Sequence, residues 1–169
     1  MKGTEIKDLR ARAIIDCKGK PLLEVDVITE DGVMGRGASP SGISAGEHEA
    51  MVLRDGDKNW YDGNGVYKAV EMAEKVILPA IKGLDVLDQK AVDQAMIDLD
   101  GTNNKSKLGG NTTYSTSMAV MRAACSILHV PQYKYLAEGE IKTIPLPTSD
   151  FFAGGSYEQD TMPVQECTI

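Results

Sequence analysis

The sequence predicts an α+β domain in which a three-stranded antiparallel meander comes first and a helical bundle follows. Two observations predict it. Apolar residues alternate with polar ones through residue 38, and from residue 66 to residue 129 they recur at helical spacing. A third observation, the frequent Pro and Gly after residue 140, sets the last segment apart.

The meander is predicted from alternation and turn signals. In PLLEVDVITEDG, the apolar residues Leu23, Val25 and Val27 alternate with acidic ones, which is the pattern of a half-buried strand. A CKGK turn precedes this run, and an Asp-Gly pair, a common hairpin turn, follows it. We expect strands over residues 4–15, 22–30 and 33–38.

The helices are predicted from apolar stripes. One stripe covers residues 66–81, where Pro79 should kink or end the helix unless the last turn is separate. Two further stripes cover residues 86–99 and 113–129. Pro131 then opens a short helix in the position that proline favours. His129, just before it, is expected to have a capping or surface role.

Composition restricts the class of protein. The chain has 169 residues, of which 42% are hydrophobic and 25% charged, so a folded core is expected. Its net charge of −7 argues against nucleic-acid binding, which needs a basic face. The three cysteines, Cys17, Cys125 and Cys167, form no zinc pattern. No apolar run suits a leader or a membrane span, so the cytoplasm is expected.

One loop, SPSGISAGEHEA at residues 39–50, has the composition of a lid or a cation site. Gly42 and Gly46 allow backbone conformations that other residues avoid, and Ser41 and Ser44 carry hydroxyls. A hydroxyl can complete the oxygen shell of Mg²⁺, and a loop of small residues between glycines can close over a ligand. The alternative is a plain surface connector.

The remaining carboxylates give few further candidates. Asp55 and Asp57 flank a glycine, which indicates a turn before a helix. Glu166 lies in the strand-like run PVQECTI, where a carboxylate should face a pocket or pair with a cation. We found neither a Gly-x-Ser-x-Gly elbow nor a phosphate-binding P-loop. Because PVQECTI needs a strand to pair with, we expect the chain to be part of a larger protein.

Several motifs, taken in order, closely resemble the amino-terminal part of enolase (phosphopyruvate hydratase). Family members carry PSGASTG, RDGDK and LDGT-x-NKSKLGAN, for which this chain has PSGISAG, RDGDK and LDGTNNKSKLGGN. DCKGKPLLEVDV and VPQYKYLAEG match further family segments. The five stretches cover residues 16–27, 40–46, 54–58, 99–111 and 130–139.

The resemblance implies a fold and an activity. The fold would be an enolase-like amino-terminal α+β domain over residues 1–138, and residues 139–169 would contain the first strands of an incomplete β/α barrel. The family are glycolytic lyases that dehydrate 2-phosphoglycerate to phosphoenolpyruvate. A barrel lysine removes a proton and two Mg²⁺ ions stabilise the enolate-like species, because a weakly acidic C–H ionises only where the developing charge is stabilised. The resemblance also implies a small phosphorylated substrate and a cytoplasmic homodimer.

By the same resemblance, the loop is the lid that closes over substrate, and Ser44 is the residue that reaches the second Mg²⁺. Ile43 and Ala45 replace the usual Ala and Thr, and the branched Ile43 would stiffen the lid. The implied lid residues are Ser41, Gly42, Ile43, Ser44, Ala45 and Gly46.

The tail carries the other implied site residues. Gln165 and Glu166 would line the substrate site, and Glu166, tied to the leaving hydroxyl, is the implied catalytic residue. Tyr157 stands where the family has an active-site histidine, and Asp150 and Ala153 replace two asparagines. Tyrosine cannot become cationic as histidine can, which would weaken binding of phosphate at that position. In the family, the base lysine and the carboxylates that bind the first Mg²⁺ lie beyond the position of Ile169.

Two further departures concern packing. Thr112, Thr113 and Ser115 are more polar than the family's residues, on a helix face that the resemblance would pack against the barrel. Lys18 replaces an arginine near the family's dimer contact.

Three hypotheses follow. The first is part of an Mg²⁺-dependent enolase, inactive as an isolated chain. The second is a catalytically silent, enolase-like binding or assembly module, which the substitutions in the tail favour. The third is an enolase-superfamily enzyme with a changed substrate.

Overall fold

The computed structural model describes residues 2–40, 46–137, 139–153 and 166–169. The chain divides into two compact units, Met1–Leu136 and Ala137–Ile169, and each is described by itself. The first unit has the predicted α+β fold, a three-stranded sheet followed by helices. The second contains two short strands.

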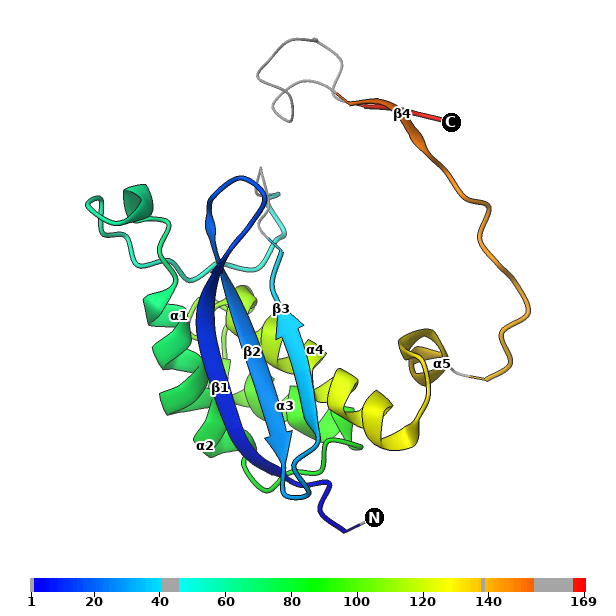
Figure 1. Ribbon diagram of the computed structural model, residues 1–169. Coiled ribbons are helices and arrows are strands. Elements are labelled where there is room, and N and C mark those ends of the chain that lie inside the picture. Colours follow the sequence, from blue (N-terminus) through cyan, green and yellow to red (C-terminus); the bar gives the residue numbers. More distant parts are fainter. Residues whose placement is uncertain (1, 41–45, 138, 154–165) are drawn as a thin grey trace. The chain divides into compact units, whose positions relative to one another are not determined.

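The sheet of the first unit is an antiparallel meander in the order β1-β2-β3 (Figure 1). Its strands are β1 (Ile6–Ile15), β2 (Pro21–Thr29) and β3 (Met34–Ala38). The three strands that alternation predicted are therefore confirmed. Most of their ends differ from the predicted ones by one or two residues.

Local hydrogen bonds form the two turns of the meander. Between β1 and β2, the Asp16 carboxylate accepts the backbone N–H groups of Lys18 and Lys20 at 2.8 and 2.7 Å. Between β2 and β3, Gly32 has a φ of 81°, a conformation that glycine adopts without strain. Its N–H donates to the carbonyl of Thr29 at 2.9 Å. The DG and CKGK signals therefore act as the sequence predicted.

The first helical stripe forms three consecutive segments after a 3₁₀ turn, η1 (Tyr61–Gly63). They are α1 (Tyr67–Met72), the π-helical turn η2 (Ala73–Ile77) and α2 (Leu78–Ile81). Pro79 lies in the first turn of α2, directly after the π-helical turn η2. Backbone angles are helical at both junctions between these segments, so the helix continues without a break, and its irregularity is the π-helical turn η2 just before Pro79.

The longer helices end as their sequences indicate. In α3 (Gln89–Asp100), the Asp88 carboxylate caps the start, and Gly101 ends the helix with a left-handed φ of 67°. The exposed His129 occupies the C-cap of α4 (Gly110–Leu128), as expected, and α5 (Gln132–Leu136) follows. None of the helices in the described ranges combines the length and the apolar character that crossing a membrane requires.

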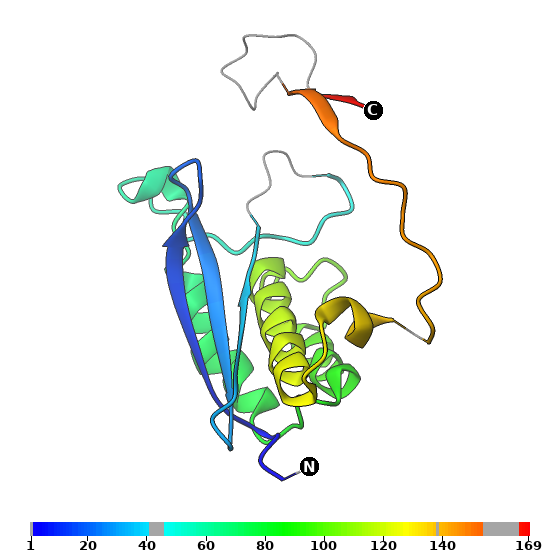
Figure 2. The same ribbon diagram turned by 45° about the vertical axis from the view of Figure 1, so that its right-hand side comes forward.

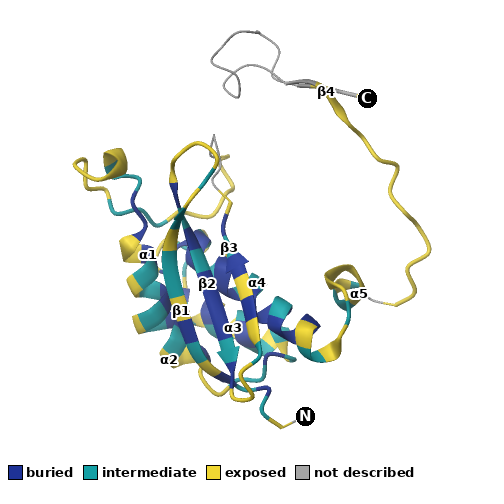
Figure 3. Cartoon of the chain, viewed as in Figure 1, coloured by how far each residue is buried: buried dark blue, intermediate teal, exposed yellow. Residues whose placement is uncertain are grey.

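The helices cover one face of the sheet, and the core lies between the two layers (Figures 2 and 3). The residues of β2 that alternation turned inward, Leu23, Val25 and Val27, are fully buried. Burial of such aliphatic side chains is the main favourable contribution to folding. From the helical layer the core receives Val66, Ala69, Ala73, Ile77, Ile81, Val86, Val92, Met96, Leu108, Ala119, Val120 and Ala123.

Two glycines bring β3 unusually close to α4. A Cβ atom added to Gly35 would overlap the backbone of Ala119 and Ala123, and one added to Gly37 would overlap the carbonyl oxygen of Ser115. The helix side of the contact is also made of small residues. The backbones therefore pack directly, and no larger side chain fits between them.

The hydroxyl groups at the start of α4 face inward, which corrects one expectation. Thr112 and Ser115 are fully buried within the first unit. Their hydroxyls donate to the carbonyls of Leu108 at 2.6 Å and Leu23 at 3.3 Å. The interpretation that this polar face packs against a barrel is therefore wrong for these two residues. Small side chains are required here because the sheet approaches the helix closely. That approach is a tertiary contact, so the local sequence did not reveal it.

In the second unit, β4 (Asp150–Ala153) pairs antiparallel with β5 (Glu166–Thr168). Asp150 lies opposite Thr168, and Ala153 lies opposite Glu166. Reciprocal hydrogen bonds of 2.9 Å between Ser149 and Ile169 extend the pairing. The described part of the predicted strand PVQECTI is thus a strand. The β/α barrel that these strands would begin remains a prediction.

We expect Gly37→Ala to destabilise the first unit by roughly 1–3 kcal/mol, because the new methyl group overlaps the backbone of α4. Urea denaturation monitored by circular dichroism measures the free energy of unfolding. Met34→Ala, on the same strand at a position that is 47% exposed, should change it by less than about 1 kcal/mol. Equal stability of Gly37→Ala and the unaltered protein would contradict direct backbone packing.

Candidate functional site

The predicted lid lies between two segments that the structure does describe. Its residues Ser41, Gly42, Ile43, Ser44 and Ala45 fall outside the described residues. Gly46 is described and exposed. Its N–H donates to the Glu49 carboxylate at 2.8 Å, and the N–H of Glu49 donates back to the Gly46 carbonyl at 3.1 Å. A compact turn therefore begins at Gly46, the last residue of the predicted lid.

Both flanks of the lid are attached to the domain. Before it, the N–H of the buried Ser39 donates to the carbonyl of Leu23 in β2 at 3.1 Å. After it, the N–H of Met51 donates to the Asn104 carbonyl at 2.8 Å, and the Met51 carbonyl accepts the N–H of Gly110 at 2.6 Å. These backbone bonds fix the places where the chain leaves and rejoins the folded unit.

A buried asparagine attaches the segment after the lid through two hydrogen bonds. The Oδ1 of Asn111 accepts the N–H of Leu53 at 2.9 Å, and its Nδ2 donates to the Leu53 carbonyl at 3.1 Å. Asn111 is 5% exposed, so both bonds are shielded from water. The side chain thus mimics a strand neighbour for Leu53 and holds the segment against the start of α4.

The loop between α3 and α4 is organised by Asp100, which is 3% exposed. Its carboxylate accepts the hydroxyl and the N–H of Thr102, and the N–H of Leu108 at 2.7 Å. Burial tends to raise the pKa of Asp100, but the hydrogen bonds from Thr102 and Leu108 hold it below its ordinary value. The LDGTNNKSKLGGN motif therefore serves as scaffold for the lid's second flank.

The RDGDK motif is also structural. The Nη1 of the half-buried Arg54 donates to the carbonyls of Pro21 and Asn64 at 2.7 and 2.8 Å. Burial lowers the pKa of Arg54. The Asp55 carboxylate accepts the N–H groups of Tyr67 and Lys68 at 3.0 and 2.7 Å, which caps the start of α1. The expected turn before a helix is present, and Asp55 ties it to that helix.

An open cavity of about 570 Å³ lies beside these attachments. One wall comes from the segment around the lid, including Val52. The other comes from Met96 and Ile97 of α3 and from Tyr114 and Met118 of α4. The cavity is thus mainly apolar and lies where the lid segment meets the helical layer.

Few charged groups line the cavity. They are Glu49, Asp93 and Lys105. In the described part of the chain, no group of three or more His, Cys, Asp and Glu residues is placed to hold a metal ion. These residues therefore do not fit Mg²⁺ on their own. The cavity can supply apolar contact together with these few charged groups.

The predicted site residues of the tail are only partly described. Gln165 and Tyr157 fall outside the described residues. Glu166 begins β5, and its backbone pairs with that of Ala153. Asp150 is exposed at the start of β4. The structure thus places two of the departures and the predicted catalytic residue on one pair of strands, and their roles remain predictions.

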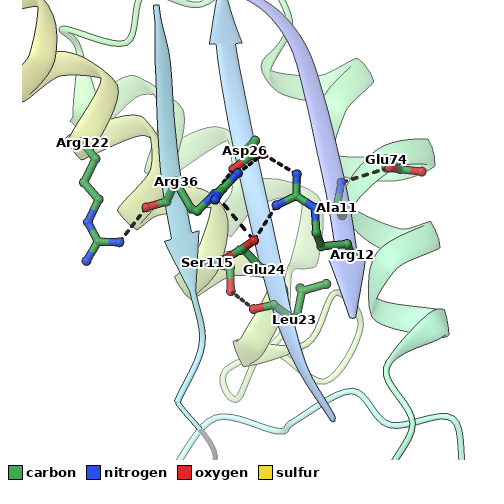
Figure 4. Close-up of polar contacts among 9 residues, drawn as sticks. All are labelled: Ala11, Arg12, Leu23, Glu24, Asp26, Arg36, Glu74, Ser115 and Arg122. Carbon is green, nitrogen blue, oxygen red and sulfur yellow. Dashed lines mark hydrogen bonds and ion pairs between the residues drawn. The ribbon is translucent and has the colours of Figure 1, made fainter. Parts of the chain in front are cut away.

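The outer face of the sheet carries a compact ion-pair network (Figure 4). Asp26 of β2, 3% exposed, accepts from Arg36 of β3 at 2.6 and 2.9 Å and from Arg12 of β1. Arg12 also binds Glu24 at 2.5 Å. The bond from Arg36, together with that from Arg12, lowers the pKa of Asp26 to about 2, against the opposing effect of burial. Since every charge here has a partner, we interpret the network as structural.

Figure 4 also shows how side chains tie the helices to the sheet edges. The Glu74 carboxylate accepts the N–H of Ala11 in β1 at 2.9 Å. The guanidinium of Arg122 on α4 donates to the carbonyl of Arg36 in β3 at 2.6 Å. Sequence patterns gave no sign of these bonds, because each joins residues far apart in the chain.

A family model described as "Enolase, N-terminal domain" matches residues 6–136. The matched range is more than half of the chain. It contains the whole sheet, the helices α1 to α5, both flanks of the lid and the apolar cavity. The strands β4 and β5 lie outside it.

We expect Asn111→Asp to destabilise the protein by about 2 kcal/mol or more at neutral pH, because a buried carboxylate would replace the donor to the Leu53 carbonyl. Asn103→Asp makes the same chemical change at an exposed position of the neighbouring loop and should have little effect. Urea denaturation of both variants tests this. Equal losses would show that the attachment of Leu53 contributes nothing measurable.

The Asp26 network predicts a pH dependence. Because the pKa of Asp26 is lowered on folding, its contribution is fully present above about pH 4 and is lost as pH falls toward 2. With solvent screening of the half-exposed arginines, we expect Asp26→Asn to cost about 1–2 kcal/mol at neutral pH. The difference from the unaltered protein should shrink between about pH 4 and pH 3 in urea denaturation. A constant difference over that range would contradict the assignment, and Asp98→Asn, on the surface of α3, is the control.

Proposed function

Because the chain belongs to the enolase family through its N-terminal domain, we propose that it is part of an Mg²⁺-dependent lyase that dehydrates 2-phosphoglycerate to phosphoenolpyruvate in glycolysis. The family match carries this proposal, since it spans the segment that contains the lid sequence. Domain membership by itself establishes a relationship to the enolase lyases. Substrate and metal belong to the proposal.

The lid would contribute one side chain to the chemistry. We assign Ser44 as the residue whose hydroxyl binds Mg²⁺, with Ser41, Gly42, Ile43, Ala45 and Gly46 as the rest of the closing loop. The support is the position of these residues between two attached flanks, Ser39 on one side and Met51 to Leu53 on the other. A loop attached in this way can move while its ends stay in place.

The tail would contribute the residues that contact substrate. We assign Glu166 as the catalytic residue at the leaving hydroxyl and Gln165 and Tyr157 as its neighbours in the substrate site. The base lysine and the metal-binding carboxylates that the family implies correspond to positions after Ile169. We place residues 1–138 in the N-terminal domain and residues 139–169 at the start of the barrel. A cytoplasmic homodimer belongs to the same proposal.

A second candidate is a catalytically silent module that binds or assembles with a partner. The observation that favours it is the set of departures in the tail, Asp150, Ala153 and Tyr157. A third, an enzyme of the same superfamily with a changed substrate, rests on Tyr157 alone. Turnover of 2-phosphoglycerate separates these candidates from the first.

The test uses the whole protein that contains these residues, with 2-phosphoglycerate as substrate and the absorbance of phosphoenolpyruvate as the signal. We expect Mg²⁺-dependent turnover. Glu166→Gln should lower kcat by about 100-fold or more, as loss of an acid–base group does. Ser44→Ala should raise the Mg²⁺ concentration needed for half-maximal rate, while the matched lid variant Ser41→Ala should leave it unchanged.

The outcomes separate the alternatives. Absence of turnover by the unaltered, folded protein would overturn the first candidate and leave the silent module and the enzyme with a changed substrate. Turnover that survives Glu166→Gln would keep the enzyme but overturn the assignment of that residue. Equal effects of Ser44→Ala and Ser41→Ala would overturn the assignment of Ser44 as the metal-binding hydroxyl.

A further inference from the structure

The loop that precedes α1 carries an exposed group of aromatic side chains. Trp60 and Tyr61 are each 45% exposed, and Tyr67 is 55% exposed. The ring of Trp60 meets that of Tyr61 edge to face at 5.2 Å and that of Tyr67 at 6.1 Å with a tilt of 33°. The three rings therefore form one continuous aromatic surface. Exposed aromatic residues of this kind are enriched at binding surfaces.

The backbone that presents these rings is held in an unusual conformation. Tyr61 and Asp62 have φ angles of 46° and 49°, in the left-handed region that non-glycine residues rarely adopt. The turn is closed by the N–H of Gly63 donating to the Trp60 carbonyl and the N–H of Gly56 donating to the Gly63 carbonyl, both at 3.0 Å. The loop is thus tied back on itself, so the backbone that carries Trp60 is held in a closed turn.

Carboxylates surround an open pocket beside the rings. It is lined by Trp60 and Tyr67, by Asp57, Glu71 and Asp55, and by a single cationic side chain, Lys68. Two of these charged side chains, Asp55 and Lys68, already have hydrogen-bond partners within the domain. The Asp55 carboxylate caps α1, and the Lys68 ammonium donates to the Asp55 carbonyl at 2.6 Å.

Asp57 is the carboxylate best placed to receive a ligand. The N–H of Asn59 donates to one of its oxygens at 2.9 Å, and Asp57 has no ion pair among the residues that the structure describes. Glu71 forms an exposed pair with Lys75 at 2.7 Å, which water screens and a ligand can displace. The lining therefore combines aromatic faces with an excess of negative charge.

We propose that this pocket binds the guanidinium group of an arginine on a basic segment of a partner protein. A guanidinium is planar and cationic, so it can stack on the face of Trp60 while its N–H groups donate to the Asp57 carboxylate. The charge of the lining disfavours phosphate and other anions. An ammonium group is compact and strongly hydrated, and uses an aromatic face less well.

The experiment uses the fluorescence of Trp60, which is the chain's single tryptophan. The full chain is titrated with an acetylated Gly-Arg-Gly-Arg-Gly amide, and with peptides that carry citrulline or lysine in place of arginine. Citrulline keeps the shape of arginine without its charge. We expect a saturable change with the arginine peptide, in roughly the millimolar range, and at least about fivefold weaker binding of the other two.

Two variants locate the binding. Asp57→Asn keeps an acceptor for the N–H of Asn59, so the loop should fold, and it should weaken binding of the arginine peptide by about fivefold. Asp98→Asn removes the same charge from an exposed position of α3 and should change binding by less than about twofold.

Three results would overturn the proposal. They are the absence of a saturable change, equal binding of the citrulline or lysine peptide, and equal weakening by the two variants. The last would indicate attraction to the chain's overall charge of −7 and no defined pocket.

Discussion

The direct contact between the backbones of β3 and α4 fixes the position of this helix against the sheet in the first unit. It depends on Gly35 and Gly37, because any side chain there would push the helix away from the sheet. The lid segment leaves the sheet at the end of β3 and is received again at the start of α4, where Asn111 holds Leu53. The separation of the lid's two flanks is therefore set by the contact of two glycines with one helix.

Several residues of the motifs that carry the resemblance have a structural role in this domain. Asp100 and Asn111 organise the loop and the segment beside the lid, and Asp55 caps a helix. Each of these polar groups has hydrogen-bond partners within the domain. Of the residues in this chain, Ser44 from the lid and Glu166 from the tail would take a direct part in the chemistry of the proposed enzyme, beside the groups that correspond to positions after Ile169. The folded domain would act mainly by presenting the first of them.

The elements of the fold could be predicted from local pattern, since alternation and helical stripes record which side chains face the core. The Asp-Gly turn was also interpreted correctly, because its effect is confined to a few residues. Long-range partners could not be predicted. Asp26 has the alternation of an exposed residue, yet arginines of both neighbouring strands cover it. The bond of Asn111 to Leu53 spans 58 positions and leaves no local signal. Ser44 and Glu166 could be singled out from local composition and pattern, but their specific roles rest on the resemblance.

The attachment of both lid flanks has a consequence for how this family can change. Ser39 and Met51 are held by the domain's own hydrogen bonds, so the two ends of the connection between them are fixed. Doubling the length of such a connection costs only about 0.6 kcal/mol of closure entropy. Substitutions such as Ile43 and Ala45, or insertions, can therefore accumulate there without unfolding the scaffold.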